Sequence, residues 1–289
     1  VALSFVANNS SSSNITSEII HKAKQVWSMD RKIVGFGVDE YEKFVEMANV
    51  GLHILYREVQ DDIDYRHFSA NHLSHSKKLN EIENKVVNFL KEFDELLDSF
   101  NNDEVLSSYG IKKLDHATYI YGDISLLDCK KNAVNAKFHG GVALLAKRIL
   151  SVESDIEIKT LTSIENQATY LKYIESADDD EIVIFTSGIP SPSFKKLYKM
   201  IIDTINPKVV QHWGDIDLGG FIILNMLEKV YPNTVALNMD CEIYTKPFEK
   251  LSKQEVSKLE KLLTKSKNAF LIEKAIADGH KYEQESYLW

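Results

Sequence analysis

Short apolar runs and amphipathic stretches alternate along the C-terminal half of the chain. From about Asp155 onward, strands are predicted at 156–164, 181–185, 208–212 and 234–239, and helices at 167–175, 193–205 and 220–230. A last helix is predicted to begin near Ser252, which can form a capping box with Glu255. Repeated strand–helix–strand units predict an α/β fold, with a parallel sheet and helices on its faces. Ligands of such sheets bind beyond the carboxyl ends of the strands.

The N-terminal part of the chain shows helical spacing instead. Helices are predicted at 17–27 and 39–56, and a long amphipathic helix at 76–100, whose apolar stripe indicates packing rather than chemistry. The segment 106–151 is mixed, with short strands predicted at 117–121 and 124–127 and a helix at 141–150. We therefore expect a mainly helical arm at 1–105, a small α+β winged-helix-like module at 106–153, and the α/β domain with a C-terminal tail at 154–289.

Composition is that of an ordinary globular protein. Of the 289 residues, 44% are apolar and 27% are charged. The apolar runs stay well short of the ~18 residues that cross a bilayer, and the first residues lack the basic and apolar regions of a signal peptide. The two cysteines, Cys129 and Cys241, are too few for a disulfide framework or a four-cysteine zinc site. The simplest expectation is a reduced, cytoplasmic protein without a membrane span.

The net charge of −9 bears on nucleic-acid binding. A protein that binds duplex DNA unaided usually carries a basic face, so this charge argues against strong unaided binding. An acidic chain can still act on DNA through bound metal ions, a partner or a local basic strip. One of the more basic stretches supplies candidate DNA contacts, namely Lys130, Lys131, Lys137, Lys147 and Arg148. Because such a cluster is more often a solvated face, both interpretations stay open.

Acidic residues stand at three of the predicted strand ends. Glu165 follows the first strand, Asp215 and Asp217 follow the third, and Asp240 follows the fourth. Because the carboxyl ends of parallel strands meet at one edge of the sheet, these side chains would repel one another if all were ionised. A hard divalent cation relieves that repulsion, and magnesium takes a few carboxylates plus waters. Such an ion polarises a phosphodiester and activates a water or hydroxyl nucleophile.

Each piece of this pattern also has an ordinary structural explanation. Most Asp-x-Asp pairs are solvated turns, Asn166 can cap the helix that follows it, and Asp240 can simply end its strand. Competing site types fit less well. An EF-hand loop that began at Asp215 would need Glu where Met226 stands, and in haloacid-dehalogenase phosphatases the Asp-x-Asp pair follows the first strand. The sequence also contains no phosphate-loop motif and no Gly-x-Ser-x-Gly nucleophile elbow.

Three segments carry a resemblance to a known family: TLTSIENQATY at 160–170, IVIFTSGIPSPSFKKL at 182–197 and HWGDIDLGGFIIL at 212–224. They resemble the Toprim domain of the JetD family, the nuclease subunits of Wadjet plasmid-defence systems. The A subunits of type IIB topoisomerases are more distant relatives. The resemblance is strongest from about 157 to 240, and the tail KYEQESYLW at 281–289 is similar to the family's closing Glu-Gln-Glu segment.

The resemblance implies both a site and a function. Glu165 matches the Toprim glutamate, while Asp215 and Asp217 match its Asp-x-Asp pair, so all three are expected to be catalytic ligands of Mg²⁺ or Mn²⁺. A second metal position is expected from Asp240, Glu283 and Glu285. Members of the family cut double-stranded DNA, act as dimers, and work with a condensin-like complex that recognises closed circular DNA. Such a partner also accounts for an acidic nuclease chain.

The chain departs from the family pattern in one loop and lacks one topoisomerase feature. The family often has two glycines after the second strand, where this chain has Ser187 and Gly188. Type IIB topoisomerases use an upstream tyrosine nucleophile, and Tyr109, Tyr119 and Tyr121 lie upstream but in no motif of that kind. We therefore expect hydrolysis by a metal-activated water, with Glu165 as a ligand and candidate base. A topoisomerase-like transesterase and a non-cutting DNA-binding scaffold are the alternatives, although a scaffold does not need the three carboxylates.

Overall fold

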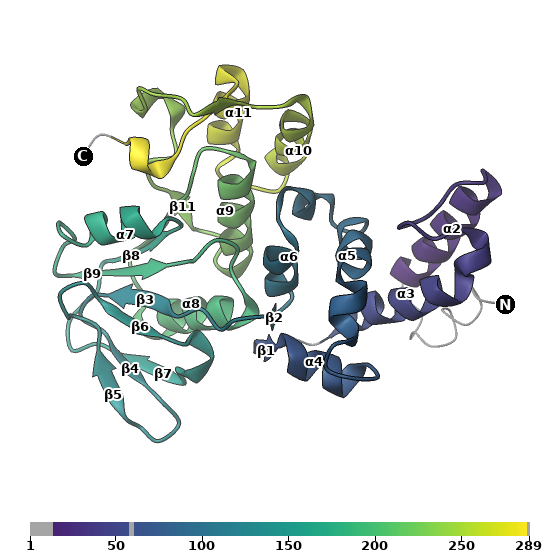
Figure 1. Cartoon of the computed structure of the whole chain (residues 1–289). Coiled ribbons are helices and arrows are strands. Elements are labelled where there is room, and N and C mark those ends of the chain that lie inside the picture. Colours follow the sequence, from purple (N-terminus) through teal and green to yellow (C-terminus); the bar gives the residue numbers. More distant parts are fainter. Residues whose placement is uncertain (1–13, 58–60, 288–289) are drawn as a thin grey trace. The chain divides into compact units, whose positions relative to one another are not determined.

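The computed structural model describes residues 14–57 and 61–287. Residues 1–13 and 58–60 of the predicted arm, and the last two residues of the predicted tail, lie outside the described residues. Contacts divide the described chain into two compact units, one of residues 14–57 and 63–113 and the other of residues 61–62 and 114–287 (Figure 1). Residues 61–62 therefore belong to the second unit although the first unit surrounds them in the sequence.

The first unit is mainly helical. Its elements are α2 (Asn14–Ser28), η1 (Val38–Glu40), α3 (Tyr41–Tyr56), β1 (Ile63–Asp64), α4 (Tyr65–His72), α5 (Lys78–Lys91), η2 (Glu95–Ser99), α6 (Asn102–Ser108) and β2 (Ile111–Lys112), where η marks a 3-10 helix. The two short strands pair in parallel. The helices predicted at 17–27 and 39–56 are confirmed, because apolar residues at helical spacing such as Phe44 and Met47 are buried.

The prediction of a single long helix at 76–100 is wrong. Its apolar stripe is buried as expected, but α5 ends at Lys91 and a separate 3-10 helix follows. The Asp94 carboxylate accepts a hydrogen bond from the Leu96 amide and so begins η2. An aspartate that bonds to a backbone amide two residues ahead favours a cap over a helix interior.

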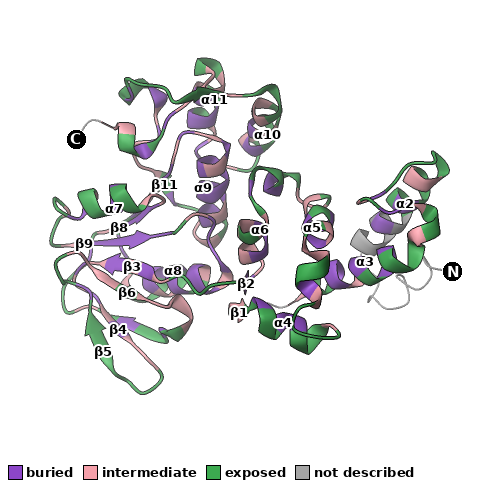
Figure 2. Cartoon of the chain, viewed as in Figure 1, coloured by how far each residue is buried: buried purple, intermediate pink, exposed green. Residues whose placement is uncertain are grey.

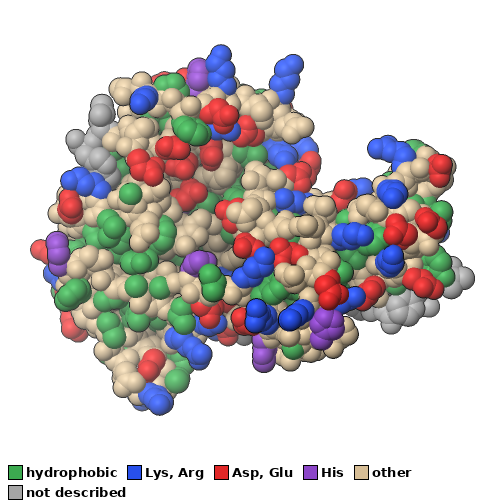
Figure 3. Space-filling view, in the orientation of Figure 1, with side chains coloured by type: hydrophobic (Ala, Val, Ile, Leu, Met, Phe, Trp, Pro, Cys, Tyr) green, Lys and Arg blue, Asp and Glu red, His purple; other side chains and the backbone are tan. Residues whose placement is uncertain are grey.

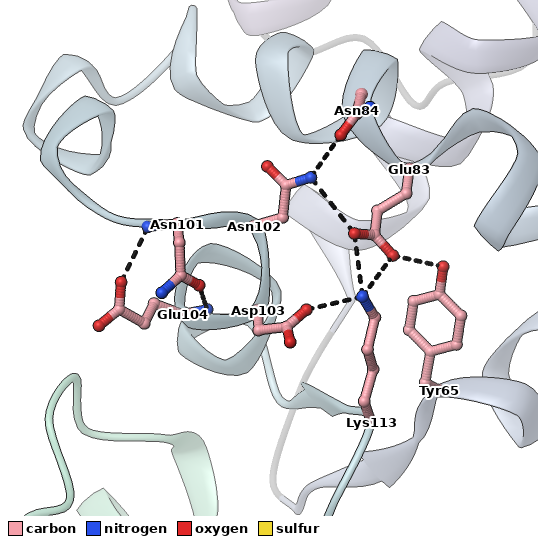
Figure 4. A network of polar contacts seen from close by, with 8 residues as sticks. All are labelled: Tyr65, Glu83, Asn84, Asn101, Asn102, Asp103, Glu104 and Lys113. Carbon is pink, nitrogen blue, oxygen red and sulfur yellow. Dashed lines mark hydrogen bonds and ion pairs between the residues drawn. The ribbon is translucent and has the colours of Figure 1, made fainter.

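A polar network joins the end of the first unit to its helices (Figure 4). The Glu83 carboxylate on α5 accepts hydrogen bonds from the Tyr65 hydroxyl (2.7 Å), from Lys113 Nζ (3.0 Å) and from Asn102 Nδ2 (3.2 Å). Lys113 also lies 2.7 Å from Asp103. Burial raises the pKa of Tyr65, and its hydrogen bond to Glu83 also raises it, so this hydroxyl stays protonated and donates to Glu83.

The second unit is built on a mixed six-stranded sheet. Its strands, in spatial order, are β11 (Val235–Ala236), β10 (Val209–Trp213), β8 (Thr160–Ile164), β9 (Glu181–Phe185), β3 (Thr118–Tyr121) and β6 (Val142–Leu144). The predicted parallel arrangement is confirmed for β11, β10, β8 and β9. The sheet is not wholly parallel, because β3 pairs antiparallel with β9 and β6 pairs antiparallel with β3.

The prediction of a helix at 141–150 is wrong. Gly140 and Gly141 have φ of 91° and 77°, and the chain then enters β6 and the 3-10 helix η3 (Ala146–Arg148). A three-stranded antiparallel sheet of β5 (Ala133–Asn135), β4 (Ser125–Leu127) and β7 (Ser151–Glu153) completes this region. Residues 114–153 thus contribute strands to the second unit, and the winged-helix character predicted for 106–153 is not confirmed.

The remaining elements of the second unit are helices and short pairings. They are α7 (Gln167–Tyr173), α8 (Pro192–Ile205), α9 (Leu218–Val230), η4 (Cys241–Ile243), β12 (Glu249–Lys250), α10 (Lys253–Leu263), α11 (Ala269–Asp278), β13 (His280–Lys281) and η5 (Gln284–Ser286). The capping box between Ser252 and Glu255 is confirmed. The chain forms an α/β fold in which helices follow the parallel strands, as the alternating pattern predicted.

The two faces of the main sheet have different partners. On one face, Leu161, Ile184 and Val210 pack with residues of α8 and α9 in the buried apolar core (Figure 2). On the other face the contacts are aromatic, with ring centroids of Tyr170 and Phe185 6.2 Å apart. Side chains alternate between the two faces of the sheet, and both faces are covered by other elements. The last residues of β8 and β10, Ile164 and Trp213, are therefore buried.

Candidate metal centre

Glu165 and Asp215 adjoin at the carboxyl ends of neighbouring parallel strands. The strands β8 and β10 are in register, with Ile164 opposite Trp213. Beyond that pair, the Glu165 amide donates to the Trp213 carbonyl (3.0 Å), and the Asp215 amide donates to Glu165 Oε2 (3.2 Å). The two acidic residues predicted from separate parts of the sequence are therefore brought together by strand register.

Asp217 begins the helix α9. Its Oδ1 accepts a hydrogen bond from the Gly220 amide (2.8 Å), which makes it the N-cap. A Cβ added to Gly220 would lie 2.1 Å from the Asp215 carbonyl oxygen, so the backbone of the Asp-x-Asp loop folds back directly onto the first turn of the helix. A Cβ on Gly214 would lie 2.9 Å from Glu165 Oε2. Glycines at these positions let the two acidic segments approach closely.

The C-terminal tail lies against the Asp-x-Asp loop. Ile216 forms an isolated antiparallel bridge with Tyr282, in which each amide donates to the other residue's carbonyl. The next turn of the tail, η5, brings the Gln284 amide within 2.8 Å of Asp215 Oδ1. Glu283 and Glu285 flank that glutamine and are exposed. The tail thus brings the acidic residues Glu283 and Glu285 next to the residue that bonds Asp215.

Electrostatics mark Asp215 as the centre of this cluster. Burial raises the pKa of the Asp215 carboxyl to about 7, against the lowering effect of the Gln284 amide. The charges of Asp217, Glu285 and Glu283 contribute to that rise. Burial also raises the pKa of Asp217, while its bond from the Gly220 amide lowers it. Acidic side chains gather on the same face of the second unit between α7 and the helices α10 and α11 (Figure 3).

The donor chemistry suits a hard cation, but the side chains do not form a coordination shell. In residues 14–57 and 61–287, no three His, Cys, Asp or Glu side chains are placed so that they could hold a metal ion together. Glu165 and Asp215 each accept a backbone hydrogen bond through one oxygen, and Asp217 caps its own helix. All are oxygen donors of the kind that magnesium takes, and a cation would offset the repulsion that raises the pKa of Asp215.

Asp240 has a different environment from the other predicted ligands. Its Oδ2 lies 2.7 Å from Lys274 Nζ, and its Oδ1 accepts from the Glu242 amide at the start of η4. Burial alone would raise the pKa of Asp240, but the hydrogen bonds from Lys274 and Glu242 leave it below the ordinary value. Because the charge of Asp240 is already balanced by Lys274, Asp240 is a weaker candidate ligand for a cation than Asp215.

The residues predicted as DNA contacts all lie in the second unit: Lys130, Lys131, Lys137, Lys147 and Arg148. Lys130 and Lys131 are exposed in the turn between β4 and β5. Lys137 lies 3.0 Å from Asp179, and Lys147 lies 2.5 Å from Asp115. These ion pairs neutralise part of the positive charge that the sequence pattern suggested.

The upstream tyrosines show no arrangement that would activate a nucleophile. Tyr109 belongs to the first unit, where burial raises its pKa to about 12. Tyr119 lies on β3, with its ring 5.8 Å from Phe185 and 6.1 Å from Tyr170. Tyr121 is half-buried on the same strand. A raised pKa makes Tyr109 a poorer attacking group near neutral pH.

Sequence reasoning did not identify two buried polar residues beside the site. Gln284 is fully buried and forms hydrogen bonds with two separate segments, at Asn166 after β8 and at Trp213 and Asp215 at the end of β10. His212 on β10 is also fully buried, its Nδ1 lies 2.9 Å from Ser163 Oγ, and burial lowers its pKa to about 3, so it is neutral. The only signal for Gln284 was its place between two glutamates, and a single histidine within a strand carries no signal at all.

Comparison with known proteins decides the family. A family model described as "Wadjet protein JetD, C-terminal" matches residues 125–289, which is more than half of the chain. The chain belongs to the JetD family. A relative from Bacillus cereus (strain Q1), named Wadjet protein JetD, is 25% identical over 178 residues, covering 60% of this chain and 43% of that protein. The JetD model covers β4 and everything after it, including Glu165, Asp215 and the tail.

The matched region spans less than half of the B. cereus JetD protein. The family match therefore concerns the C-terminal part of JetD. The residues of this chain that it covers include Glu165, Asp215 and Asp217. Within the part of the chain that the structure describes, no helix is long and apolar enough to cross a membrane.

Proposed function

We propose that this JetD-family chain is a metal-dependent DNA endonuclease subunit whose Toprim domain begins near residue 154. The observation that carries the proposal is the contact between Glu165 and the Asp215 amide at the ends of adjacent parallel strands, beside Asp217 and the acidic tail. A scaffold gains nothing from a carboxyl whose pKa is raised to about 7 by burial and, to a smaller extent, by neighbouring carboxylates. A strongly perturbed carboxyl cluster is instead typical of a functional site.

The proposed site divides the work among a few residues. Glu165, Asp215 and Asp217 would hold Mg²⁺ or Mn²⁺, and Glu283 and Glu285 would supply a second position. When bound there, such an ion would stabilise charge on the phosphodiester and lower the pKa of an attacking water. Glu165, whose Oε2 is fixed by the Asp215 amide, is also the candidate base. The Gly220 bond that caps α9 fixes Asp217.

The proposed partners follow from the family and the charge. The substrate is double-stranded plasmid DNA, delivered by a condensin-like complex of a Wadjet defence system to a dimer of this chain. With a net charge of −9 and two of the five candidate basic residues in ion pairs, the chain has little unaided grip on duplex DNA. Delivery by a partner would supply that grip.

The main competing function is a topoisomerase-like transesterase. It needs an activated tyrosine, and the raised pKa of Tyr109 argues against that residue. The readout that separates the two is the DNA end after a denaturing quench. A 5′ end attached to protein would favour the transesterase, and free ends would favour hydrolysis.

Replacement of the central carboxylates tests the proposal. Asp215→Ala is expected to weaken Mn²⁺ binding, measured by calorimetry, by at least tenfold. Glu165→Ala is expected to lower the rate of DNA cutting in the presence of the DNA-loading partners by on the order of a thousandfold. Both variants are expected to fold, because removal of one member of a repelling cluster relieves strain in the metal-free protein.

Asp203→Ala is the matched control, because Asp203 is an exposed carboxylate on α8 that pairs with Lys199. It is expected to bind Mn²⁺ and to cut DNA as the unmodified chain does. Equal Mn²⁺ binding by the Asp215→Ala and unmodified proteins would reject the metal site. Normal cutting by a folded Glu165→Ala protein would place the active site elsewhere.

A further inference from the structure

Gln284 occupies an unusual position for an uncharged polar side chain. It lies between two exposed glutamates, yet it is fully buried, with an exposed fraction of 0%. A buried amide costs free energy unless both its donor and its acceptor are satisfied. In this protein both are satisfied, and by groups from different segments.

The donor side of the Gln284 amide is bound to the end of β10. Its Nε2 lies 2.7 Å from the Trp213 carbonyl oxygen, which also accepts the Glu165 amide at 3.0 Å. One carbonyl therefore holds both the tail and the first residue of the acidic pair. A carbonyl oxygen has two lone pairs and can serve both donors.

The acceptor side of the same amide is bound to the end of β8. Gln284 Oε1 accepts from the Asn166 amide at 2.8 Å, directly after Glu165. Asn166 in turn donates from Nδ2 to Glu285 Oε1 at 2.5 Å. The tail is thus attached to the first strand end through both a buried and an exposed side chain.

The backbone of Gln284 completes the arrangement. Its amide donates to Asp215 Oδ1 at 2.8 Å and so fixes the direction of that carboxylate. One residue therefore contacts the segments that carry Glu165 and Asp215 and sets where Glu283 and Glu285 lie. Glutamate could not replace it, because an ionised carboxylate cannot donate to the Trp213 carbonyl.

We propose that Gln284 is the positioning residue of the proposed metal centre, because it holds the C-terminal tail against the two strand ends that carry Glu165 and Asp215. The inference rests on the proposed function. Groups that orient metal ligands without touching the metal typically change metal affinity by 10–100-fold when they are replaced. Gln284 acts in that way, through Asp215 and through the ends of β8 and β10.

The test replaces the amide by an apolar side chain of similar length. In Gln284→Met, the Asn166 amide loses its acceptor, so its hydrogen exchange in the metal-free full-length chain is expected to become at least tenfold faster. Mn²⁺ binding, measured by calorimetry, is expected to weaken by about 10–100-fold. The matched control is Gln254→Ala, an exposed glutamine on α10, which is expected to change neither quantity.

The outcomes separate this inference from the proposed function. If Asp215→Ala weakens Mn²⁺ binding and Gln284→Met does not, the metal site stands and the positioning role is wrong. If neither variant weakens binding, both the proposed site and this inference fail. Faster exchange at Asn166 without a change in Mn²⁺ affinity would also overturn the inference. In that case Gln284 would hold the tail, but the position of the tail would not affect metal binding.

A measurement on the unmodified chain decides the matter if Gln284→Met fails to fold. Mn²⁺ is expected to slow hydrogen exchange at the amides of Gln284 and Asn166 by at least tenfold, because the ion and the tail stabilise the same arrangement. The Asp215→Ala protein is expected to show no such slowing. Unchanged exchange at both amides in the unmodified chain with saturating Mn²⁺ would overturn the inference.

Discussion

At the scale of single residues, Ser187 carries a conformational cost beside the proposed site. It follows β9 with a φ of 59°, and Gly188 after it has a φ of 75°. A left-handed backbone costs a residue with a Cβ roughly 1–2 kcal/mol, whereas glycine adopts it freely. The two glycines that the family resemblance implies at this place would adopt this backbone freely, and the chain keeps the conformation with a serine.

Ser187→Gly is expected to stabilise the protein by about 0.5–1 kcal/mol in urea unfolding, since the relief of strain exceeds the added freedom of the unfolded chain. Ser176→Gly is the control, because Ser176 is exposed and has no positive φ. It is expected to be neutral or destabilising. A loss of stability in Ser187→Gly would show that the serine side chain makes a contribution larger than the strain.

A second residue-scale prediction concerns the buried Glu181 at the start of β9. Burial raises the pKa of its carboxyl, although the hydroxyl groups of Thr162 and Tyr173 donate to Oε1 and lower it. The folded protein therefore holds this proton more tightly than the unfolded chain does. The stability contributed by the proton is fully present below the ordinary pKa of about 4.5 and is lost as the pH rises through the raised value.

Glu181→Gln keeps the acceptor and removes the titration. The variant is expected to match the unmodified protein in free energy of unfolding near pH 4 and to exceed it at pH 7, as measured by urea unfolding at both values. Glu175→Gln, an exposed glutamate paired with Lys172, is expected to change neither value. If Glu181→Gln were less stable than the unmodified chain at pH 7, the hydrogen bonds to the ionised carboxylate would stabilise the fold by more than its desolvation destabilises it.

At the scale of elements, close backbone approach decides the shape of the Asp-x-Asp loop. Gly219 and Gly220 are neighbours in the first turn of α9, yet their surroundings differ. A Cβ on Gly220 would meet the Asp215 carbonyl oxygen at 2.1 Å, whereas one on Gly219 would come no closer than 3.3 Å to Asp217 Oδ1. The contact at Gly220 is with the backbone of Asp215, which can move only if the Asp-x-Asp loop moves, whereas the contact at Gly219 is with a side chain.

Gly220→Ala is therefore expected to destabilise the protein by about 1–3 kcal/mol, the usual cost of overpacking, and to weaken Mn²⁺ binding as Asp215 is displaced. Gly219→Ala is the matched variant one residue away. It is expected to stay close to the unmodified protein or gain slightly, since alanine is a better helix former. Thermal unfolding and calorimetry of both variants check the pair, and equal effects would show that the approach at Gly220 is not the constraint.

At the scale of the whole molecule, a short segment belongs to a different unit from its sequence neighbours. Asp61 and Asp62 are grouped with the second unit, where Asp62 lies at the start of α8. Its Oδ1 accepts from the Ser193 amide (3.1 Å), and its Oδ2 accepts from Ser191 Oγ (2.9 Å). A carboxylate at a helix N-terminus satisfies unpaired amides and suits the helix dipole.

Asp62→Ala is expected to lower the stability of the second unit by about 1 kcal/mol, the usual cost of a lost cap, and to speed hydrogen exchange in the first turn of α8. Asp61→Ala is the control, since Asp61 is exposed and its carboxylate lies 3.2 Å from the exposed Lys196 Nζ, an ion pair of the kind that contributes little to stability. Unchanged exchange in α8 of the Asp62→Ala protein would mean that the N-cap Ser191, which accepts from the Phe194 amide, holds the first turn without Asp62.

The sequence by itself determined the alternating strands and helices from β8 to α9 in the second unit and the residues at the strand ends. The strands β8, β9 and β10 and the helices between them follow from apolar periodicity, because burial on a sheet and on a helix requires different spacings. The identities of Glu165, Asp215 and Asp217 as strand-end carboxylates followed from the same pattern. The proximity of Glu165 and Asp215 could be expected from the sequence, because the carboxyl ends of parallel strands lie at one edge of the sheet.

Tertiary structure alone decided the features that depend on contacts distant in the sequence. Residues 142–144 have helical spacing but form β6, because β3 offers an edge with which they can pair. The helix predicted at 76–100 ends early, because Asp94 finds a backbone amide to cap. Gln284 became part of the site only when the tail met strand ends about 70 and 120 residues away. Local propensity carries no information on such partners, so these choices are made by packing.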